Sequence, residues 1–185
     1  MAIHTFAAIY IGSYEVSLKI FEISARKNIR KIDYIRSRIE LGRDAYSRGV
    51  IGYELVEALC DTLEQFTKIM KEYQVDGYEA YAAAALRDVS NELFILDQIR
   101  IRTGLLVKVL SNSEHRFISY KSVAMREDFE RMIQKGAAVV DAGGGGMQHH
   151  TGIMQFSAKE LRFHKSDAGG SMARIAVAMT TFHSV

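Results

Sequence analysis

The stretch Val139-Val140-Asp141-Ala142-Gly143-Gly144-Gly145-Gly146 is the most informative part of this sequence. An apolar strand delivers an aspartate into a run of glycines. Because glycine has no Cβ, consecutive amides of such a run can turn inward and form a concave site for an anion. The alternative is a flexible hairpin turn, although a turn between two strands rarely needs so many glycines. We therefore predict a phosphate-binding loop at Gly143, Gly144, Gly145 and Gly146, with Asp141 placed to hold a cation or to orient water.

The chain before this loop shows strand-like segments first and alternating helices and strands afterwards. Three alternating segments with short connections predict an antiparallel meander, at Thr5–Ile11, Val16–Ile23 and Ile29–Leu41. Next come a predicted helix, strand, helix, strand and helix, at Tyr53–Tyr73, Gly77–Ala85, Asn91–Ile101, Leu105–Leu110 and Ser113–Met125. The first of these helices carries one apolar stripe, at Val56, Leu59, Leu63, Phe66, Met70 and Tyr73. Ser90 or Asn91 is a suitable cap for the second helix. This order predicts an α/β fold, a ribonuclease-H-like lobe with a mixed five-stranded sheet.

The segments after residue 136 repeat the opening pattern of the chain. Strand-like stretches follow one another at Ala137–Ala142, Gly152–Phe156 and Glu160–Phe163. A pattern that restarts within one chain indicates an internal duplication. We therefore expect a first lobe over residues 1–127 and an incomplete second lobe of the same type over residues 137–185.

Composition limits the classes of partner. The formal net charge is +2, with basic residues spread along the chain, which argues against a nucleic-acid or membrane-surface partner. No apolar run reaches membrane-spanning length, and the N-terminus shows no signal-peptide pattern, so a cytoplasmic location is expected. Cys60, the single cysteine, lies among apolar residues at helical spacing and is expected to be a small buried hydrophobe.

Five short motifs follow one another along the chain, at Ala7–Glu15 with Gly12-Ser13, Ala82-Ala83-Ala84-Ala85-Leu86-Arg87-Asp88, Thr103-Gly104, Ser111-Asn112-Ser113-Glu114-His115-Arg116-Phe117, and Asp141–His149. In this order they resemble the exopolyphosphatase / guanosine pentaphosphate phosphohydrolase family of the actin-like ATPase superfamily, over about residues 6 to 174. The resemblance implies hydrolysis of terminal phosphoanhydrides in inorganic polyphosphate or guanosine pentaphosphate, with magnesium as cofactor. It also implies phosphate binding by Gly12, Ser13, Arg87 and the glycines of the second loop, metal binding by Asp141, and catalytic roles for Glu114, His115 and Asp141.

Several motif positions depart from the family pattern. Tyr10 stands in place of the first-loop aspartate, and Tyr14-Glu15 in place of Asn-Ser. His115 stands in place of the proposed general base, and Gly146-Met147 in place of the phosphate-binding hydroxyls. We therefore expect a relative with lost or weak catalysis and residual phosphate or partner binding. The alternative is an active polyphosphate or guanosine pentaphosphate hydrolase that uses Glu114 or His115 as base, with its cleft completed by a second subunit.

Single residues also have plainer interpretations. Arg87 could pair with Asp88, and His115 could be an ordinary histidine on a first helical turn. A metal cluster of His149, His150 and His164 with Asp141 is disfavoured, because adjacent strand residues point to opposite faces. The strands from Val139 onward have apolar faces, which an incomplete lobe would leave uncovered. We therefore predict a homodimer that buries these strands.

Overall fold

The computed structural model describes residues 3–24 and 28–124, together with the backbone of six short strands between residues 137 and 176. The chain divides into two compact units, Met1–Asn112 and Ser113–Val185, which we describe separately. Among the described residues, no helix is both long enough and apolar enough to cross a membrane.

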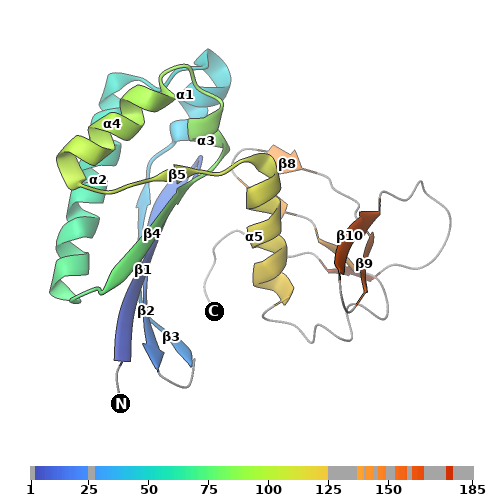
Figure 1. Cartoon of the computed structure of the whole chain (residues 1–185). Helices are drawn as coiled ribbons and strands as arrows, with labels where there is room; N and C mark the ends of the chain where they lie inside the picture. Colours follow the sequence, from blue (N-terminus) through green and yellow to red (C-terminus); the bar gives the residue numbers. More distant parts are fainter. Residues whose placement is uncertain are drawn as a thin grey trace. The chain divides into compact units, whose positions relative to one another are not determined.

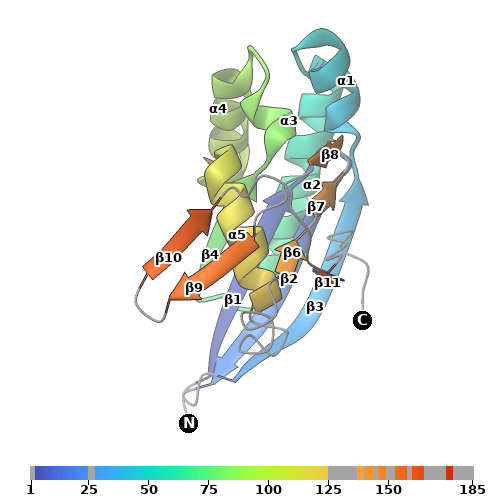
Figure 2. The ribbon, with the colours of Figure 1, turned by 90° about the vertical axis from the view of Figure 1, so that its right-hand side faces the viewer.

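A five-stranded mixed sheet forms the centre of the first unit. Its strands are β1 (Ile3–Ile11), β2 (Glu15–Ser24), β3 (Ile29–Arg38), β4 (Gly77–Ala82) and β5 (Lys108–Val109). They lie in the order β3-β2-β1-β4-β5, and Figure 2 shows the long strands β1, β2 and β3 side by side. The meander β1-β2-β3 is antiparallel, whereas β4 and β5 pair parallel to β1 and β4. The predicted α/β fold with a mixed five-stranded sheet is confirmed.

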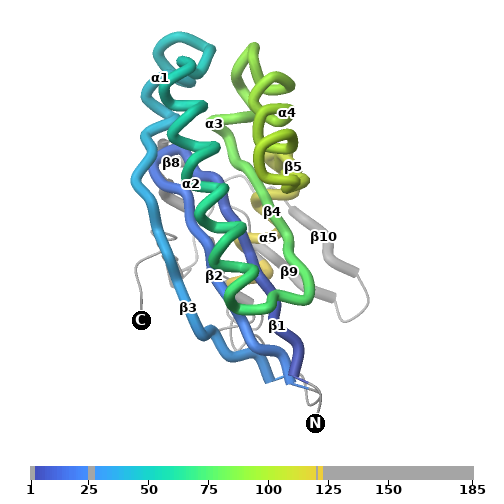
Figure 3. The backbone as a smooth tube through the Cα atoms, turned by 90° about the vertical axis from the view of Figure 1, so that its left-hand side faces the viewer, coloured from blue at the N-terminus to red at the C-terminus, as the bar shows by residue number. Residues whose placement is uncertain are grey.

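Helices pack on one face of this sheet (Figures 1 and 3). They are α1 (Leu41–Arg48), α2 (Tyr53–Glu72), α3 (Ala84–Arg87) and α4 (Glu92–Thr103). The apolar stripe predicted for α2 is buried at Val56, Leu59, Leu63, Phe66 and Met70. It packs on alternate residues of β1 and β2, among them Ile9, Ile11, Leu18 and Ile20. The core therefore forms where the apolar face of α2, repeating every three to four residues, packs on the apolar face of the sheet, repeating every second residue.

Cys60, which lies among the residues of the predicted stripe, and Tyr73, the last residue of that stripe, have distinct environments. Cys60 is fully buried, which confirms its expected role as a small hydrophobe, and burial raises the pKa of its thiol. Tyr73, by contrast, is exposed and donates its hydroxyl hydrogen to Asp33 Oδ2 at 2.9 Å. The stripe therefore ends at Met70 rather than at Tyr73.

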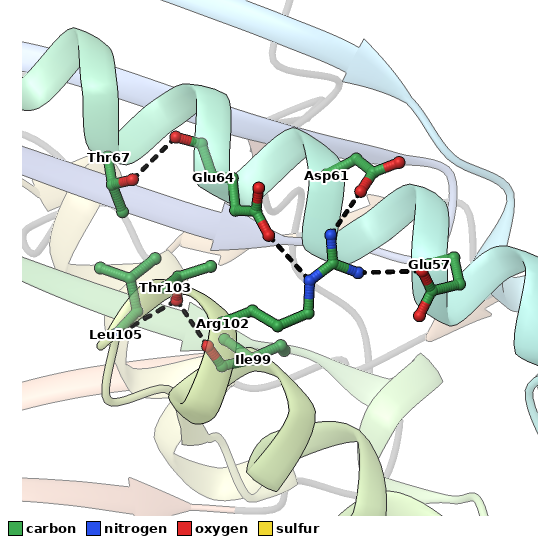
Figure 4. A network of polar contacts seen from close by, with 8 residues as sticks. All are labelled: Glu57, Asp61, Glu64, Thr67, Ile99, Arg102, Thr103 and Leu105. Atoms are coloured by element: carbon green, nitrogen blue, oxygen red, sulfur yellow. Dashed lines mark hydrogen bonds and ion pairs between the residues drawn. The ribbon is translucent and has the colours of Figure 1, made fainter.

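One arginine joins α4 to α2 (Figure 4). Arg102 donates through Nε to Glu64 at 2.7 Å, through Nη1 to Glu57 at 3.1 Å and through Nη2 to Asp61 at 2.5 Å. The three carboxylates follow one another at helical spacing along α2. These carboxylates raise the pKa of the guanidinium, so Arg102 is charged at any physiological pH.

The structure differs from the sequence-based expectation around α1 and α4. Strand β3 ends at Arg38 rather than Leu41, because Leu41 begins the short helix α1, which was not predicted. Strand β5 contains only Lys108 and Val109 rather than Leu105–Leu110. Asn91 does occupy the N-cap position of α4, but its side chain forms no capping bond. Its amide instead pairs with the peptide group of Ile51, donating to the oxygen at 2.9 Å and accepting from the nitrogen at 3.1 Å.

The second unit contains helix α5 (Asn112–Ala124) and short strand pairs. Its strands are β6 (Ala137–Val139), β7 (Asp141–Gly143), β8 (Gly146–Gln148), β9 (Ile153–Ser157), β10 (Glu160–His164) and β11 (Arg174–Ala176). The pairs β7-β8 and β9-β10 are antiparallel, and β6-β11 is parallel; Figure 2 shows β9 beside β10. That these strands belong to an incomplete second lobe stays a prediction.

Candidate functional site

The carboxyl ends of the parallel strands β1, β4 and β5 meet at one edge of the sheet. Ile11 pairs with Ala82, and Ala82 pairs with Val109. The pairing continues beyond the strand ends, since Ala83 donates to Ile11 at 3.0 Å and Leu110 donates to Ala82 at 2.9 Å. Open α/β sheets bind their ligands at this edge. The first loop, which we define as Gly12–Glu15, and Arg87 both follow these strand ends, so this edge is the candidate site.

The first loop is a tight turn between β1 and β2. Gly12 donates its amide hydrogen to the oxygen of Glu15 at 2.9 Å, which closes the turn. A Cβ at Gly12 would lie 3.0 Å from that same oxygen and 3.1 Å from the ring of Tyr10. Glycine at this position therefore allows a backbone approach that a larger residue would obstruct.

Tyr14 and Glu15, which stand in place of the Asn-Ser pair of the motif, each contact an arginine on β3. The guanidinium of Arg38 lies 4.8 Å from the centre of the Tyr14 ring, and Arg36 lies 3.9 Å from Glu15. Arg38 also pairs with Glu40, which raises the pKa of the arginine. The negative charge of Glu15 is thus balanced locally, so its repulsion of a phosphate is smaller than its position in the motif suggests.

Helix α1 packs directly against the first loop. Gly42 donates to the oxygen of Ser13 at 2.7 Å, and Ile39 donates to the oxygen of Tyr14 at 3.1 Å. The hydroxyl of Tyr46 lies 2.8 Å from Ser13 Oγ. A phenol is the more acidic of the two hydroxyls, and donation from Tyr46 to Ser13 leaves the Ser13 proton able to point at a ligand. Sequence reasoning missed Tyr46, because α1 is too short to show a clear apolar period.

A second set of bonds fixes the connections on either side of α1. The buried carboxylate of Asp44 accepts a hydrogen bond from the Gly52 amide at 3.0 Å. Gly49 ends α1 with a φ of 66°, a left-handed conformation that favours glycine. Its oxygen accepts a hydrogen bond from the Ser90 amide at 2.9 Å. These contacts, together with the Asn91 amide, tie the connection before α2 to the connection before α4.

Arg87, the last residue of α3, is engaged within its own lobe. Its Nε and Nη2 contact the two carboxylate oxygens of Asp88 at 3.0 and 3.2 Å, and Nη1 donates to the oxygen of Leu110 at 3.1 Å. The pairing with Asp88 is the plainer of the two interpretations of this arginine. The bond to Leu110 also places the guanidinium beside the strand ends. A phosphate-binding role for Arg87 stays a prediction.

The remaining predicted site residues belong to the second unit. Glu114 and His115 lie at the start of α5 and are partly buried. Asp141 begins β7, whose pairing with β8 places Asp141 opposite Gln148 and Gly143 opposite Gly146. The ends of the glycine run therefore form an antiparallel hairpin. Gly144, Gly145, His149 and His150 lie outside the described residues, and for Asp141 and His164 only the backbone is described.

Metal-binding groups do not cluster in the described part of the chain. Within residues 3–24 and 28–124, no group of three or more histidine, cysteine, aspartate or glutamate side chains is arranged to hold a metal ion. The metal role proposed for Asp141 concerns the second unit, where only the backbone of that residue is described.

The strand order and the three-stranded meander together define a ribonuclease-H-like lobe of the actin-like ATPase fold. The sequence profile of the Ppx/GppA phosphatase family matches residues 19–173. The chain belongs to this family, which confirms the resemblance identified from the motifs. Comparison with curated protein sequences gives no significant match.

Solved structures agree with this assignment. The crystal structure of the Aquifex aeolicus member of the Ppx/GppA protein family is 26% identical, with a TM-score of 0.68 over 79% of this chain and 46% of that one. The type II variant of the Aquifex aeolicus Ppx/GppA phosphatase is also 26% identical, with a TM-score of 0.68 over 86% and 50%. An exopolyphosphatase from Cytophaga hutchinsonii shares the fold, at 22% identity and a TM-score of 0.70 over 76% and 44%. The chain thus spans about half the length of these structures.

Proposed function

We propose that this chain is a phosphate-binding relative of the phosphoanhydride hydrolases in its family, with hydrolysis lost or weak. One observation carries the proposal: the edge of the sheet keeps the loop and the arginine that suit a phosphate, while Arg87 is already paired with Asp88 and Leu110. Phosphate, inorganic polyphosphate and guanosine pentaphosphate share the terminal phosphoryl group that such an edge would recognise. A protein partner is the remaining candidate ligand.

Hydrolysis of a terminal phosphoanhydride requires more than this edge supplies. A water oxygen bonds to the terminal phosphorus, the bridging P–O bond breaks, the leaving phosphate keeps the electron pair, and a base takes the water proton. Catalysis comes mainly from positioning and from neutralising charge on the phosphoryl oxygens. The Ser13 hydroxyl and Arg87 can contribute to the second task, but the phenol of Tyr10 cannot replace a carboxylate that places a cation. Magnesium, if used, would have to be held through Asp141.

An active hydrolase is the second candidate. It is favoured by the position of Glu114 and His115, which lie next to each other at the start of α5. Either could take a proton from water, since carboxylates and imidazoles serve as general bases near neutral pH. The cleft would then be completed by a second subunit.

Phosphate release and phosphate binding, measured on one preparation of the full chain, test the proposal. We expect phosphate release from polyphosphate or guanosine pentaphosphate with magnesium to equal that of buffer. Inorganic phosphate should shift the amide resonances of Gly12, Ser13 and Gly143–Gly146 with about millimolar affinity. Turnover above about one per second would favour the active hydrolase, and its loss in Glu114→Gln or His115→Gln would identify the base. Unshifted resonances would refute phosphate binding.

Variants at the edge of the sheet sharpen the binding measurement. Asp88→Asn removes a negative charge beside Arg87, so phosphate should bind about tenfold more tightly. Ser13→Ala removes the loop hydroxyl and should weaken binding a few-fold. Ser47→Ala is the matched control, because the Ser47 hydroxyl donates to the oxygen of Arg43 within α1. If Asp88→Asn and Ser13→Ala both bind phosphate like the parent chain and the Ser47→Ala control, the ligand does not occupy this edge.

A further inference from the structure

Helix α4 carries large apolar side chains on two opposite sides. Toward the sheet, Ile95 and Ile99 are completely buried. On the other side, Leu93 is 78% exposed, Phe94 46% and Ile101 76%. A helix that covers a sheet with one side normally carries charged and polar residues on the other. Large apolar side chains that cluster on an exposed face indicate an interaction surface.

The exposed residues of α4 form one continuous stripe. Leu93, Phe94, Asp97, Arg100 and Ile101, which we call the outer stripe, are all exposed and recur at the spacing that places residues on one side of an α-helix. Among the described residues of the chain, neither Asp97 nor Arg100 has an ion-pair partner. The acidic side of α2 differs, because its carboxylates are held by Arg102 (Figure 4). The outer stripe therefore presents three apolar groups, one acid and one base.

The outer stripe is complementary to a second copy of itself in the antiparallel orientation. In an antiparallel pair of α4 helices related by a two-fold axis near Asp97, Leu93 of one copy lies beside Ile101 of the other. Arg100 of each copy then lies within one turn of Asp97 of the other, close enough for its long side chain to reach. A polyanion would need an excess of bases, and a basic partner an excess of acids, but the stripe has equal numbers. Symmetric, self-complementary patches are the usual basis of protein dimers.

We propose that the outer stripe of α4 is a homodimer interface, formed by antiparallel packing of α4 from two copies of this chain. Three large apolar side chains per copy make an interface at or below about 1,200 Å², the size of weak or transient associations. The dimer should accordingly form at about micromolar concentration or above. This surface belongs to the first lobe, whereas the sequence predicts a dimer contact on the strands after Val139.

Charge reversal at the two ionic positions tests the arrangement directly, using sedimentation velocity of the full chain over a concentration series. Asp97→Arg gives a dimer with four arginines around its axis, and Arg100→Asp one with four aspartates. Each variant alone should dissociate at least tenfold more readily than the parent chain. An equimolar mixture should regain the dimer, because each arginine-rich copy then meets an aspartate-rich one. The double variant D97R/R100D should also dimerise, since it exchanges the charges and keeps the complementarity.

Two control variants identify the source of any change. Lys71→Glu reverses an exposed charge on α2 and should leave the dimer unaffected. Leu93→Lys should abolish the dimer through the apolar part of the stripe. A parent chain that stays monomeric at high micromolar concentration would overturn the proposal. A dimer that withstands both single reversals would do so as well, and would place the contact elsewhere, for example on the strands after Val139. Sedimentation reports the mass of the assembly, so the result does not depend on whether the chain binds phosphate.

Discussion

Replacing Gly42 by alanine tests whether α1 must lie directly against the first loop. A Cβ at this position would lie 2.9 Å from the Tyr46 ring, 3.0 Å from the Ser13 Cβ and 3.1 Å from the Ser13 oxygen. The ring is at the far end of a flexible side chain and can swing away, but its hydroxyl would then leave Ser13. The backbone oxygen of Ser13 cannot move without disturbing the bond it accepts from the Gly42 amide.

The sign of the effect depends on two opposing contributions. Alanine is about 1 kcal/mol better than glycine inside a helix, which favours the variant. Added atoms in a tightly packed site cost about 1–3 kcal/mol, which opposes it. The difference predicts a net loss of roughly 0–2 kcal/mol in the free energy of unfolding. Because Gly42 is buried against a backbone oxygen, we expect the upper half of that range.

Urea denaturation of the full chain measures this loss, with Gly77→Ala as the matched control. A Cβ at Gly77 meets only the Phe6 ring, at 3.6 Å, which is ordinary van der Waals distance. That variant should therefore be as stable as the parent chain. Gly42→Ala should also shift the amide resonances of Ser13 and Tyr14, whereas Gly77→Ala should not. Equal stability of the two variants, with unchanged Ser13 resonances, would refute the close contact between α1 and the first loop.

Two further predictions concern the helices. Arg102→Met keeps an apolar stem but leaves the carboxylates of Glu57, Asp61 and Glu64 without their cation, so the melting temperature should fall. Added salt screens these carboxylates and should therefore reduce the difference in melting temperature from the parent chain. A difference that does not change with salt would contradict the ion-pair explanation. Burial raises the pKa of the Cys60 thiol, so the folded state holds that proton more tightly than the unfolded state, where the pKa is about 8.5. The contribution of this thiol to the free energy of unfolding is therefore complete below about pH 8.5 and is lost as the pH rises above that value. We expect the urea midpoint of the parent chain to fall more between about pH 7 and 9.5 than that of Cys60→Ala.

The sheet and its main covering helix could be predicted because their patterns are long. The stripe from Val56 to Met70 repeats over several helical turns, and the strands of the meander alternate over enough residues to fix which side faces the core. Helix α1 could not be predicted in this way, because it has only eight residues and contains Gly42. What determines it is tertiary, namely the bonds from Gly42 and Tyr46 to the first loop.

The partners of the site residues were harder to predict than their positions. The motifs identified Gly12, Ser13 and Arg87 as candidate phosphate-binding residues, and in the structure they follow the ends of β1 and β4. Asn91 and Ile51, which are hydrogen-bonded, are 40 residues apart in the sequence, and Ser13 and Tyr46 are 33 residues apart. Local sequence patterns carry no information on pairs so far apart. The ion pair of Glu15 with Arg36 could not be predicted for the same reason, because Arg36 lies on a different strand.

The pairing of Arg87 with Asp88 has a direct consequence for affinity. An anion that approaches the guanidinium also approaches the carboxylate, which lies about 3 Å from the same nitrogen atoms. Two unit charges about 5 Å apart repel by roughly 1 kcal/mol in water and by about 3 kcal/mol at an effective dielectric constant near 20. Since 1.4 kcal/mol corresponds to a factor of ten in affinity, this repulsion weakens binding by about one to two orders of magnitude. For the proposed phosphate site, an affinity of tens of micromolar would therefore become about millimolar.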